Sequence, residues 1–111
     1  MPRKSVFDMN LSSVYGALLQ KAQRKGRTKE ELDKVIFWLT GHDVNALDPE
    51  MTYGDFFRSA PAYNPRAELI TGKICGIQVE AIEDPLMKQV RQLDKLVDEL
   101  AKGRPLEKIL R

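Results

Sequence analysis

DPLMKQVRQLDKLVDELAKG, residues 84–103, specifies one complete helix with a start, an apolar stripe and an end. Asp84 is suited to cap the first turn, and Pro85 fits the first helical position, where a missing N–H costs nothing. Gly103 favours the left-handed conformation that ends many helices. We therefore predict the main helix of the fold here.

The apolar residues of this helix recur at steps of three and four, the spacing of a helix packed on one side. They are Leu86, Val90, Leu93, Val97 and Leu100, widened by Leu96 and Ala101. We predict that the stripe is core, because helices of this length take most of their stability from packing. The opposite face is predicted to be solvated and carries Lys88, Arg91, Asp94, Lys95, Asp98 and Glu99.

Capping signals divide the rest of the chain into shorter helices. The clearest is the capping box of Thr28 and Glu31, which opens a helix closed by Gly41. The predicted helices cover about residues 12–26, 28–40, 52–60, 64–72 and 105–110.

Residues 73–81 break this helical pattern, because apolar residues alternate there with a period of two. A Cys75-Gly76 turn would close a minimal β-hairpin, and Gly72-Lys73 is the competing turn. The predicted fold is therefore mainly α, a small orthogonal bundle of four to five helices with a minimal β-hairpin near 73–81. At 111 residues, we expect one domain over 1–111.

Composition limits the function classes. The formal net charge of +2, from 18 basic and 16 acidic residues, favours no anionic partner. A single cysteine rules out an intramolecular disulfide. The N-terminus lacks a signal-peptide core, and the longest apolar run, Val35–Leu39, is far shorter than the roughly 20 residues that cross a membrane. We expect a cytoplasmic protein without membrane contact.

Five cations without an intervening acid form the most prominent charged cluster. They are Lys21, Arg24, Lys25, Arg27 and Lys29. Such a cluster is able to contact phosphates, but a helix end also attracts cations, and no aromatic residue is interleaved to stack on bases. We favour a solvated helix end, with anion or nucleic-acid contact as the alternative.

Residues that support catalysis or metal binding are scarce. Cys75 lies in an apolar alternation, where we predict a buried and inert thiol, although a constellation with His42 and Asp43 stays open. One cysteine and one histidine do not make a zinc site, and no phosphate-binding loop is present. We expect no metal, no cofactor and no enzymatic activity.

The run Val35–Leu39 is too long for one face of a helix. Phe37 and Trp38 point away from the face shared by Leu32, Val35, Ile36 and Leu39. Either this is a central helix, or Phe37 and Trp38 meet a homomeric or heteromeric partner. We favour the first alternative, with Trp38 covered by its own chain.

Several tracts together resemble one bacterial family, the domain-of-unknown-function 2200 family. They are residues 20–31, 38–41, 70–76, 83–87 and 93–103. The resemblance implies a compact, mainly α-helical protein of one domain, and it transfers no activity, cofactor or site. Our interpretation is a non-enzymatic protein-interaction domain that binds a protein partner or forms a homodimer. The alternative is a nucleic-acid or anion-binding accessory protein that uses residues 21–29.

Overall fold

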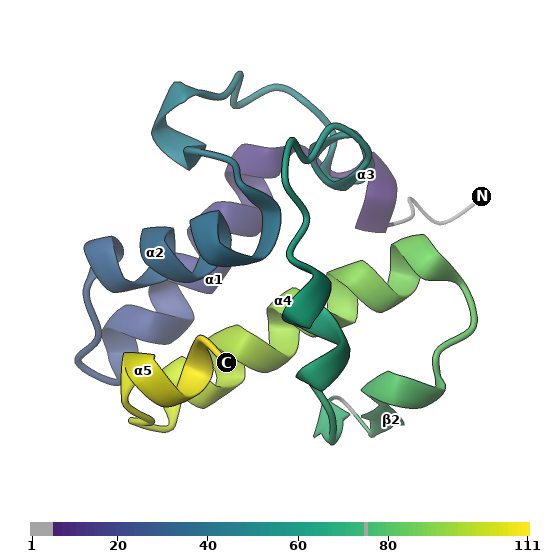
Figure 1. The fold of residues 1–111 in the computed structure, drawn as a ribbon. Coiled ribbons are helices and arrows are strands. Elements are labelled where there is room, and N and C mark those ends of the chain that lie inside the picture. The colour runs from purple at the N-terminus through teal and green to yellow at the C-terminus, as the bar shows by residue number, and fades with distance from the viewer. Residues whose placement is uncertain (1–5, 75) are drawn as a thin grey trace.

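The computed structural model describes residues 6–74 and 76–111 (Figure 1). Its α-helices are α1 (Leu11–Arg24), α2 (Lys29–Thr40), α3 (Tyr53–Arg58), α4 (Pro85–Ala101) and α5 (Leu106–Ile109). Its two strands are β1 (Lys73–Ile74) and β2 (Ile77–Gln78). Short 3-10 helices are η1 (Val6–Asp8), η2 (Val44–Ala46), η3 (Pro65–Leu69) and η4 (Val79–Ala81).

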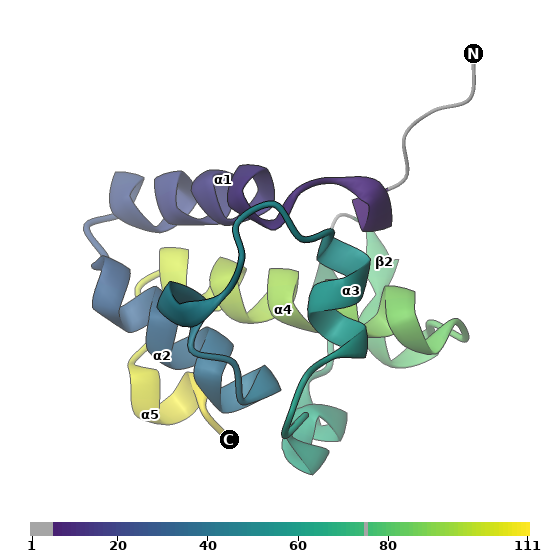
Figure 2. The ribbon, with the colours of Figure 1, turned by 90° about the horizontal axis from the view of Figure 1, so that it is seen from above.

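Helix α4 is the element around which the others pack. It contacts α1, α2, α3, α5, β1 and η4. Figure 2 shows α1 and α4 running in similar directions, with α3 crossing them steeply. The α4 stripe is buried as predicted from Val90 to Ala101, whereas Leu86 is only partly buried against the core. Helix α2 contributes a second block of core. The predicted mainly α fold with a minimal hairpin is therefore confirmed.

The predicted helix starts are confirmed at the level of single hydrogen bonds. The Asp84 carboxylate accepts from the backbone N–H of Leu86 at 3.1 Å. The side chains and backbones of Thr28 and Glu31 form the reciprocal capping box. These bonds satisfy N–H groups that a helix leaves without partners in its first turn.

Two predictions for residues 64–82 gave longer regular elements than the structure has. The helix expected over 64–72 is the shorter η3, because the backbone becomes extended at Ile70 and buries that side chain. The strand alternation expected up to Ala81 ends at Gln78, and Val79 then turns into η4 to enter the core. A two-stranded sheet has no third strand that would stabilise a longer β2 by additional pairing.

The two strands of the hairpin are joined between Ile74 and Ile77, and Gly72-Lys73 is not its turn. Ile74 pairs with Ile77 and Lys73 with Gln78 in the antiparallel register. Gly76 has a φ of 76°, which a side chain would disfavour. The prediction of a buried thiol concerns Cys75, which lies outside the described residues.

Candidate functional site

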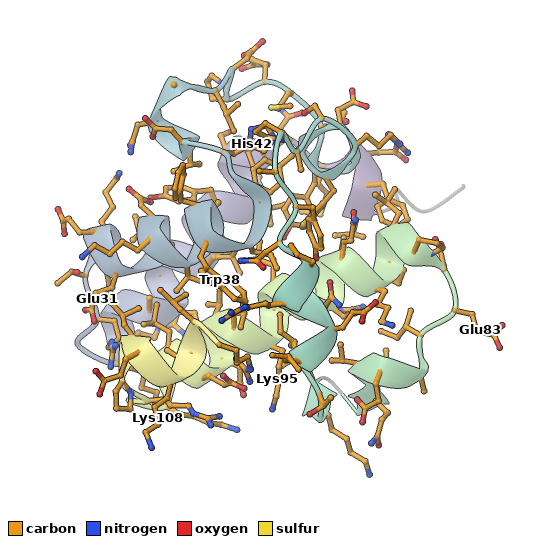
Figure 3. The ribbon with its side chains drawn as sticks, viewed as in Figure 1. Glu31, Trp38, His42, Glu83, Lys95 and Lys108 are labelled. Carbon is orange, nitrogen blue, oxygen red and sulfur yellow. The ribbon has the colours of Figure 1, made fainter. Side chains whose placement is uncertain are left out.

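The single histidine has a structural role. His42 is 8% exposed and its ring stacks on Phe56 of α3 with centroids 4.9 Å apart (Figure 3). Its Nε2 lies 2.9 Å from the Phe56 carbonyl oxygen, which accepts a hydrogen bond from the ring. His42 therefore ties the exit of α2 to α3.

Residues 6–74 and 76–111 offer no group of three or more His, Cys, Asp or Glu side chains that could hold a metal ion. In the same part of the chain, no helix has the length and hydropathy needed to span a bilayer.

The fold divides the predicted basic cluster. Three of its five cations form ion pairs with carboxylates of α2 or α4. These pairs are Lys21–Asp98 at 3.4 Å, Arg27–Glu31 at 2.7 Å and Lys29–Asp33 at 2.8 Å. Arg24 and Lys25 are exposed near the end of α1, where the helix dipole favours cations, and neither pairs with a described carboxylate.

Helix α2 has two apolar faces, of which the fold covers one. The inner face carries Leu32, Val35, Ile36 and Leu39, each at most 2% exposed. On the outer face Phe37 is 59% exposed, while Trp38 is half-buried against the core. The expectation that the chain covers this side is confirmed in part for Trp38 and is wrong for Phe37.

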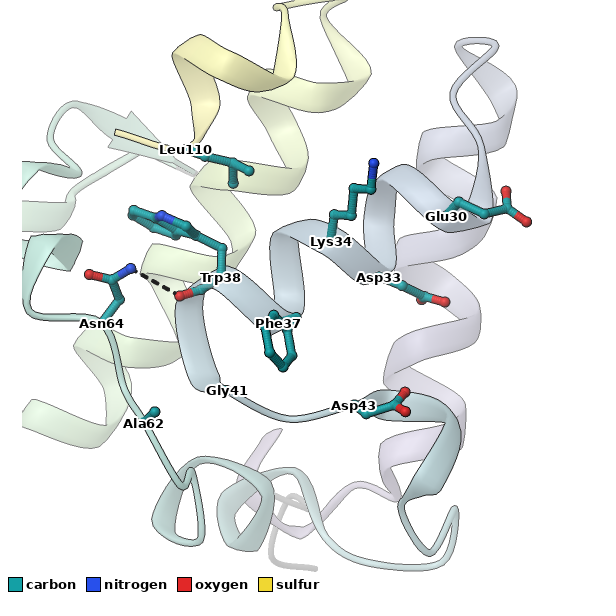
Figure 4. Close-up of a pocket in the computed structure, with 10 residues that line it drawn as sticks. All are labelled: Glu30, Asp33, Lys34, Phe37, Trp38, Gly41, Asp43, Ala62, Asn64 and Leu110. Carbon is teal, nitrogen blue, oxygen red and sulfur yellow. Dashed lines mark hydrogen bonds between the residues drawn. The ribbon is translucent and has the colours of Figure 1, made fainter.

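The outer face of α2 forms one side of a groove of about 800 Å³, shown in Figure 4 and called the α2 groove below. Ala62, Asn64 and Leu110 line the groove beside α2. Its lining residues are Glu30, Asp33, Lys34, Phe37, Trp38, Gly41, Asp43, Ala62, Asn64 and Leu110.

Residues 62–64 are fixed to the end of α2 by three hydrogen bonds. The backbone N–H groups of Ala62 and Asn64 donate to the carbonyls of Thr40 and Leu39, at 3.1 and 2.8 Å. The Asn64 side-chain amide donates to the Trp38 carbonyl at 3.1 Å (Figure 4). These bonds satisfy carbonyls that the helix end leaves without partners, and they attach this wall of the groove to α2.

Gly41 permits the close approach of this wall. Its φ of 79° is the left-handed conformation that glycine adopts without steric cost. A Cβ added at Gly41 would lie 2.8 Å from the Cβ of Ala62 and 3.0 Å from its backbone nitrogen. Any other residue at position 41 would therefore push the wall outward.

The C-terminal residues supply the wall that contains Leu110. Here the prediction of a solvated Glu99 is wrong, because the chain turns back after Gly103 and leaves Glu99 only 5% exposed. Glu99 accepts a hydrogen bond from the Arg111 guanidinium at 2.8 Å. Arg66 in turn donates to the Arg111 backbone oxygen at 3.2 Å. Ion pairing thus holds the end of the chain beside α2.

The end of the groove next to the start of α2 is acidic. Burial opposes ionisation of Asp33, but hydrogen bonds from Lys29, Tyr15 and Asn45 outweigh burial and lower the pKa of this carboxyl. Burial and the hydrogen bond to Asp33 raise the pKa of Tyr15 to about 12. Asp33 is therefore a stable anion within a structural network.

Sequence reasoning identified Phe37 and Trp38 but missed the rest of the groove. The helix predicted over 64–72 begins at Asn64, whose carboxamide oxygen accepts from the Arg66 N–H at 2.9 Å. Its amide nitrogen makes the additional bond to a carbonyl 26 residues away, for which the local pattern holds no signal. Leu110 is predicted only as the last residue of the short helix over 105–110.

The fold and the groove define a small, mainly α-helical protein with a concave surface along its second helix. The chain belongs to the family described as "Uncharacterized protein conserved in bacteria (DUF2200)", whose profile matches residues 5–111. The predicted resemblance is thereby confirmed.

The structure is also similar to the crystal structure of uncharacterized protein SP1917, with 47% sequence identity and a TM-score of 0.89. The match covers 98% of this chain and 94% of that chain. Comparison with curated proteins finds no match.

Proposed function

We propose that this protein functions by binding another protein, and that the α2 groove is the contact surface. The observation that carries the proposal is Phe37, a large apolar side chain that is 59% exposed within a concave surface. Exposed aromatic residues are enriched where proteins meet, and they contribute most when a pocket surrounds them.

The construction of the groove supports this proposal. Its volume of about 800 Å³ falls within the range of sites that enclose a ligand or an anchoring side chain. Both walls are held by hydrogen bonds or ion pairs within the chain, so little ordering is required when a partner binds. A preformed groove with an aromatic side is suited to receive an apolar anchor.

Anion binding through residues 21–29 has less support. Three of its five cations already pair with carboxylates, and an anion would have to compete for them. The pair Arg24 and Lys25 is a small surface compared with the phosphate contacts of typical nucleic-acid-binding proteins.

A photo-cross-linking amino acid at position 37 tests protein binding, with the same amino acid at position 69 as the matched control. Leu69 is 57% exposed and does not line the groove. In the native host, we expect a discrete adduct from position 37 and none from position 69. The adduct partner, once purified, should bind Phe37→Ala about tenfold more weakly than wild type, and Leu69→Ala as well as wild type.

The proposal is overturned if both positions give the same adducts, if neither gives any, or if Phe37→Ala binds the purified partner normally. An adduct between two copies of the chain would identify the homodimer as the complex.

A further inference from the structure

We infer that the α2 groove receives a cationic amphipathic segment of a different protein, in which an apolar anchor and a Lys or Arg are about two helical turns apart. This inference rests on the proposed function and adds the chemistry of the partner. It is carried by the distribution of charge and apolar surface along the groove.

The groove is acidic although the chain is not. The whole sequence has a formal net charge of +2, but the described residues that line the groove carry three carboxylates and one ammonium group. These groups are Glu30, Asp33, Asp43 and Lys34. A segment with positive charge complements this surface, whereas an acidic segment would be repelled from it.

Two of the three carboxylates are available to a partner. Glu30 is exposed and forms no ion pair with a described residue. Asp43 is also exposed, and within the described part of the chain its carboxylate accepts only from the backbone and side-chain N–H groups of Asn45, at 3.1 and 3.3 Å. Asp33 already pairs with Lys29 at 2.8 Å. Glu30 and Asp43 are therefore the groups that a partner cation would meet.

The apolar and acidic parts of the groove are separated along α2. Trp38 and Leu110 lie together at one end, and Glu30 lies at the other, with Phe37 between them (Figure 4). Glu30 and Trp38 are eight residues apart, which is about 12 Å at the rise of an α-helix. A helix lying along α2 would match this distance with an anchor and a cation seven or eight positions apart.

A second copy of the chain fits the groove less well. A two-fold contact through Phe37 would bring Glu30, Asp33 and Asp43 of both copies into one interface. Among the described residues, Lys34 is the one cation that lines the groove in each copy. Like charges in one interface destabilise it. A contact between this groove and the exposed cations at the end of α1 would be head-to-tail, and such contacts extend into open assemblies unless they close into a ring.

Selection from a library of displayed 16-residue random peptides tests the inference. Wild-type protein is the bait, and Glu30→Lys/Asp43→Lys is compared with Glu83→Lys, which changes an exposed carboxylate far from Trp38 (Figure 3). Peptides enriched on wild type should carry an apolar anchor with Lys or Arg seven or eight positions away. Binding, read from Trp38 emission with tryptophan-free peptides, should weaken about three- to tenfold in the double variant, and less at high salt.

Binding to Glu83→Lys should stay at the wild-type level. All substituted residues are exposed, and far-ultraviolet circular dichroism confirms that each variant is folded. Enriched peptides without basic residues, or equal binding to the double variant, would overturn the inference. If such peptides lost binding to Phe37→Ala, the proposed function would still stand.

Peptides that bind Phe37→Ala as tightly as wild type, or a selection without any enrichment, would overturn both proposals. A solution mass that doubles on concentration, with loss of the doubling in Phe37→Ala, would replace the cationic partner by a second copy.

Discussion

Helices α4 and α2 both have apolar surfaces too wide for one neighbouring element to bury. Other elements of the chain bury this surface on α4, but on α2 they leave part of it exposed. Helix α4 contacts four other α-helices, η4 and β1, so its stripe becomes core from Val90 to Ala101. The inner face of α2 is equally well buried, whereas Phe37 on its outer face remains exposed. Apolar periodicity therefore identifies the helix faces that need to be buried, whereas the topology of the chain determines whether other elements of the same chain bury them.

The largest expected effect is on the α4 side of this comparison. Val97 is fully buried, and Val97→Asp would place a charge in the core without a partner. We expect a loss of several kcal/mol, a large part of the roughly 5–15 kcal/mol that stabilises a domain. Denaturant unfolding measures this loss, and Val97→Ala, which only creates a cavity, should cost about 1–3 kcal/mol. An unchanged melting temperature for Val97→Asp would refute the core assignment.

The two faces of α2 provide a comparison within one helix. Leu39 is fully buried, and Leu39→Ala should cost about 2–5 kcal/mol through lost burial and a residual cavity. Phe37→Ala should change the unfolding free energy by no more than about 0.5 kcal/mol, as expected for an exposed position. Equal losses in both variants would mean that the outer face is core after all.

An intermediate effect is expected where the C-terminal residues contact α4. Glu99→Gln removes the charge that binds Arg111, and a hydrogen bond to a charged group contributes about 1.5–3 kcal/mol. The melting temperature should fall, and Trp38 emission should shift to longer wavelength as the wall containing Leu110 loosens. Glu107→Gln, at an exposed position of α5, should leave both unchanged. A red shift in that control would show that the emission change is not specific to the ion pair.

The smallest effects concern acid stability and have opposite signs in the two helices. The pKa of Asp33 is lowered in the folded protein. Its contribution to the free energy of unfolding is therefore present above the ordinary carboxyl pKa of 3.8, and it is lost as pH falls through the pKa of the folded state. Burial outweighs the Arg91 hydrogen bond and raises the pKa of Asp94. The contribution of Asp94 to the free energy of unfolding is therefore present at low pH and is lost as pH rises through the pKa of the folded state.

Melting temperatures measured from about pH 3 to 7 compare the two carboxylates. The destabilisation caused by Asp33→Asn should shrink toward low pH, and that caused by Asp94→Asn should grow. Parallel curves for the two variants would contradict the opposite shifts.

The sequence predicted best where a signal and its structural consequence lie within one turn of helix. The caps at Asp84 and Thr28 are of this kind, since both partners of each bond are neighbours. The α4 stripe was also predicted, because its apolar residues repeat from one turn to the next. The 3-10 form of η3 and the early end of β2 were missed, because tertiary burial of Ile70 and Val79 overrode local periodicity.

The sequence predicted the aromatic side of the groove but not its walls, because the walls depend on contacts between distant residues. Phe37 and Trp38 exceed the capacity of one helical face, which a sequence reveals. The walls depend on Asn64 reaching Trp38 and on Arg111 reaching Glu99, contacts that span 26 and 12 residues. Such contacts follow from the path of the whole chain and leave no periodic trace.

The close fit of Gly41 against Ala62 also constrains how this family can vary over evolution. Gly41 combines a left-handed backbone with a neighbour that leaves no room for a Cβ, so neither a change of side chain nor a small shift accommodates a replacement. Gly16 lies within α1, where an added Cβ would meet no atom within 4 Å and alanine would favour the helix. In an alignment of relatives, position 41 should therefore retain glycine while position 16 drifts.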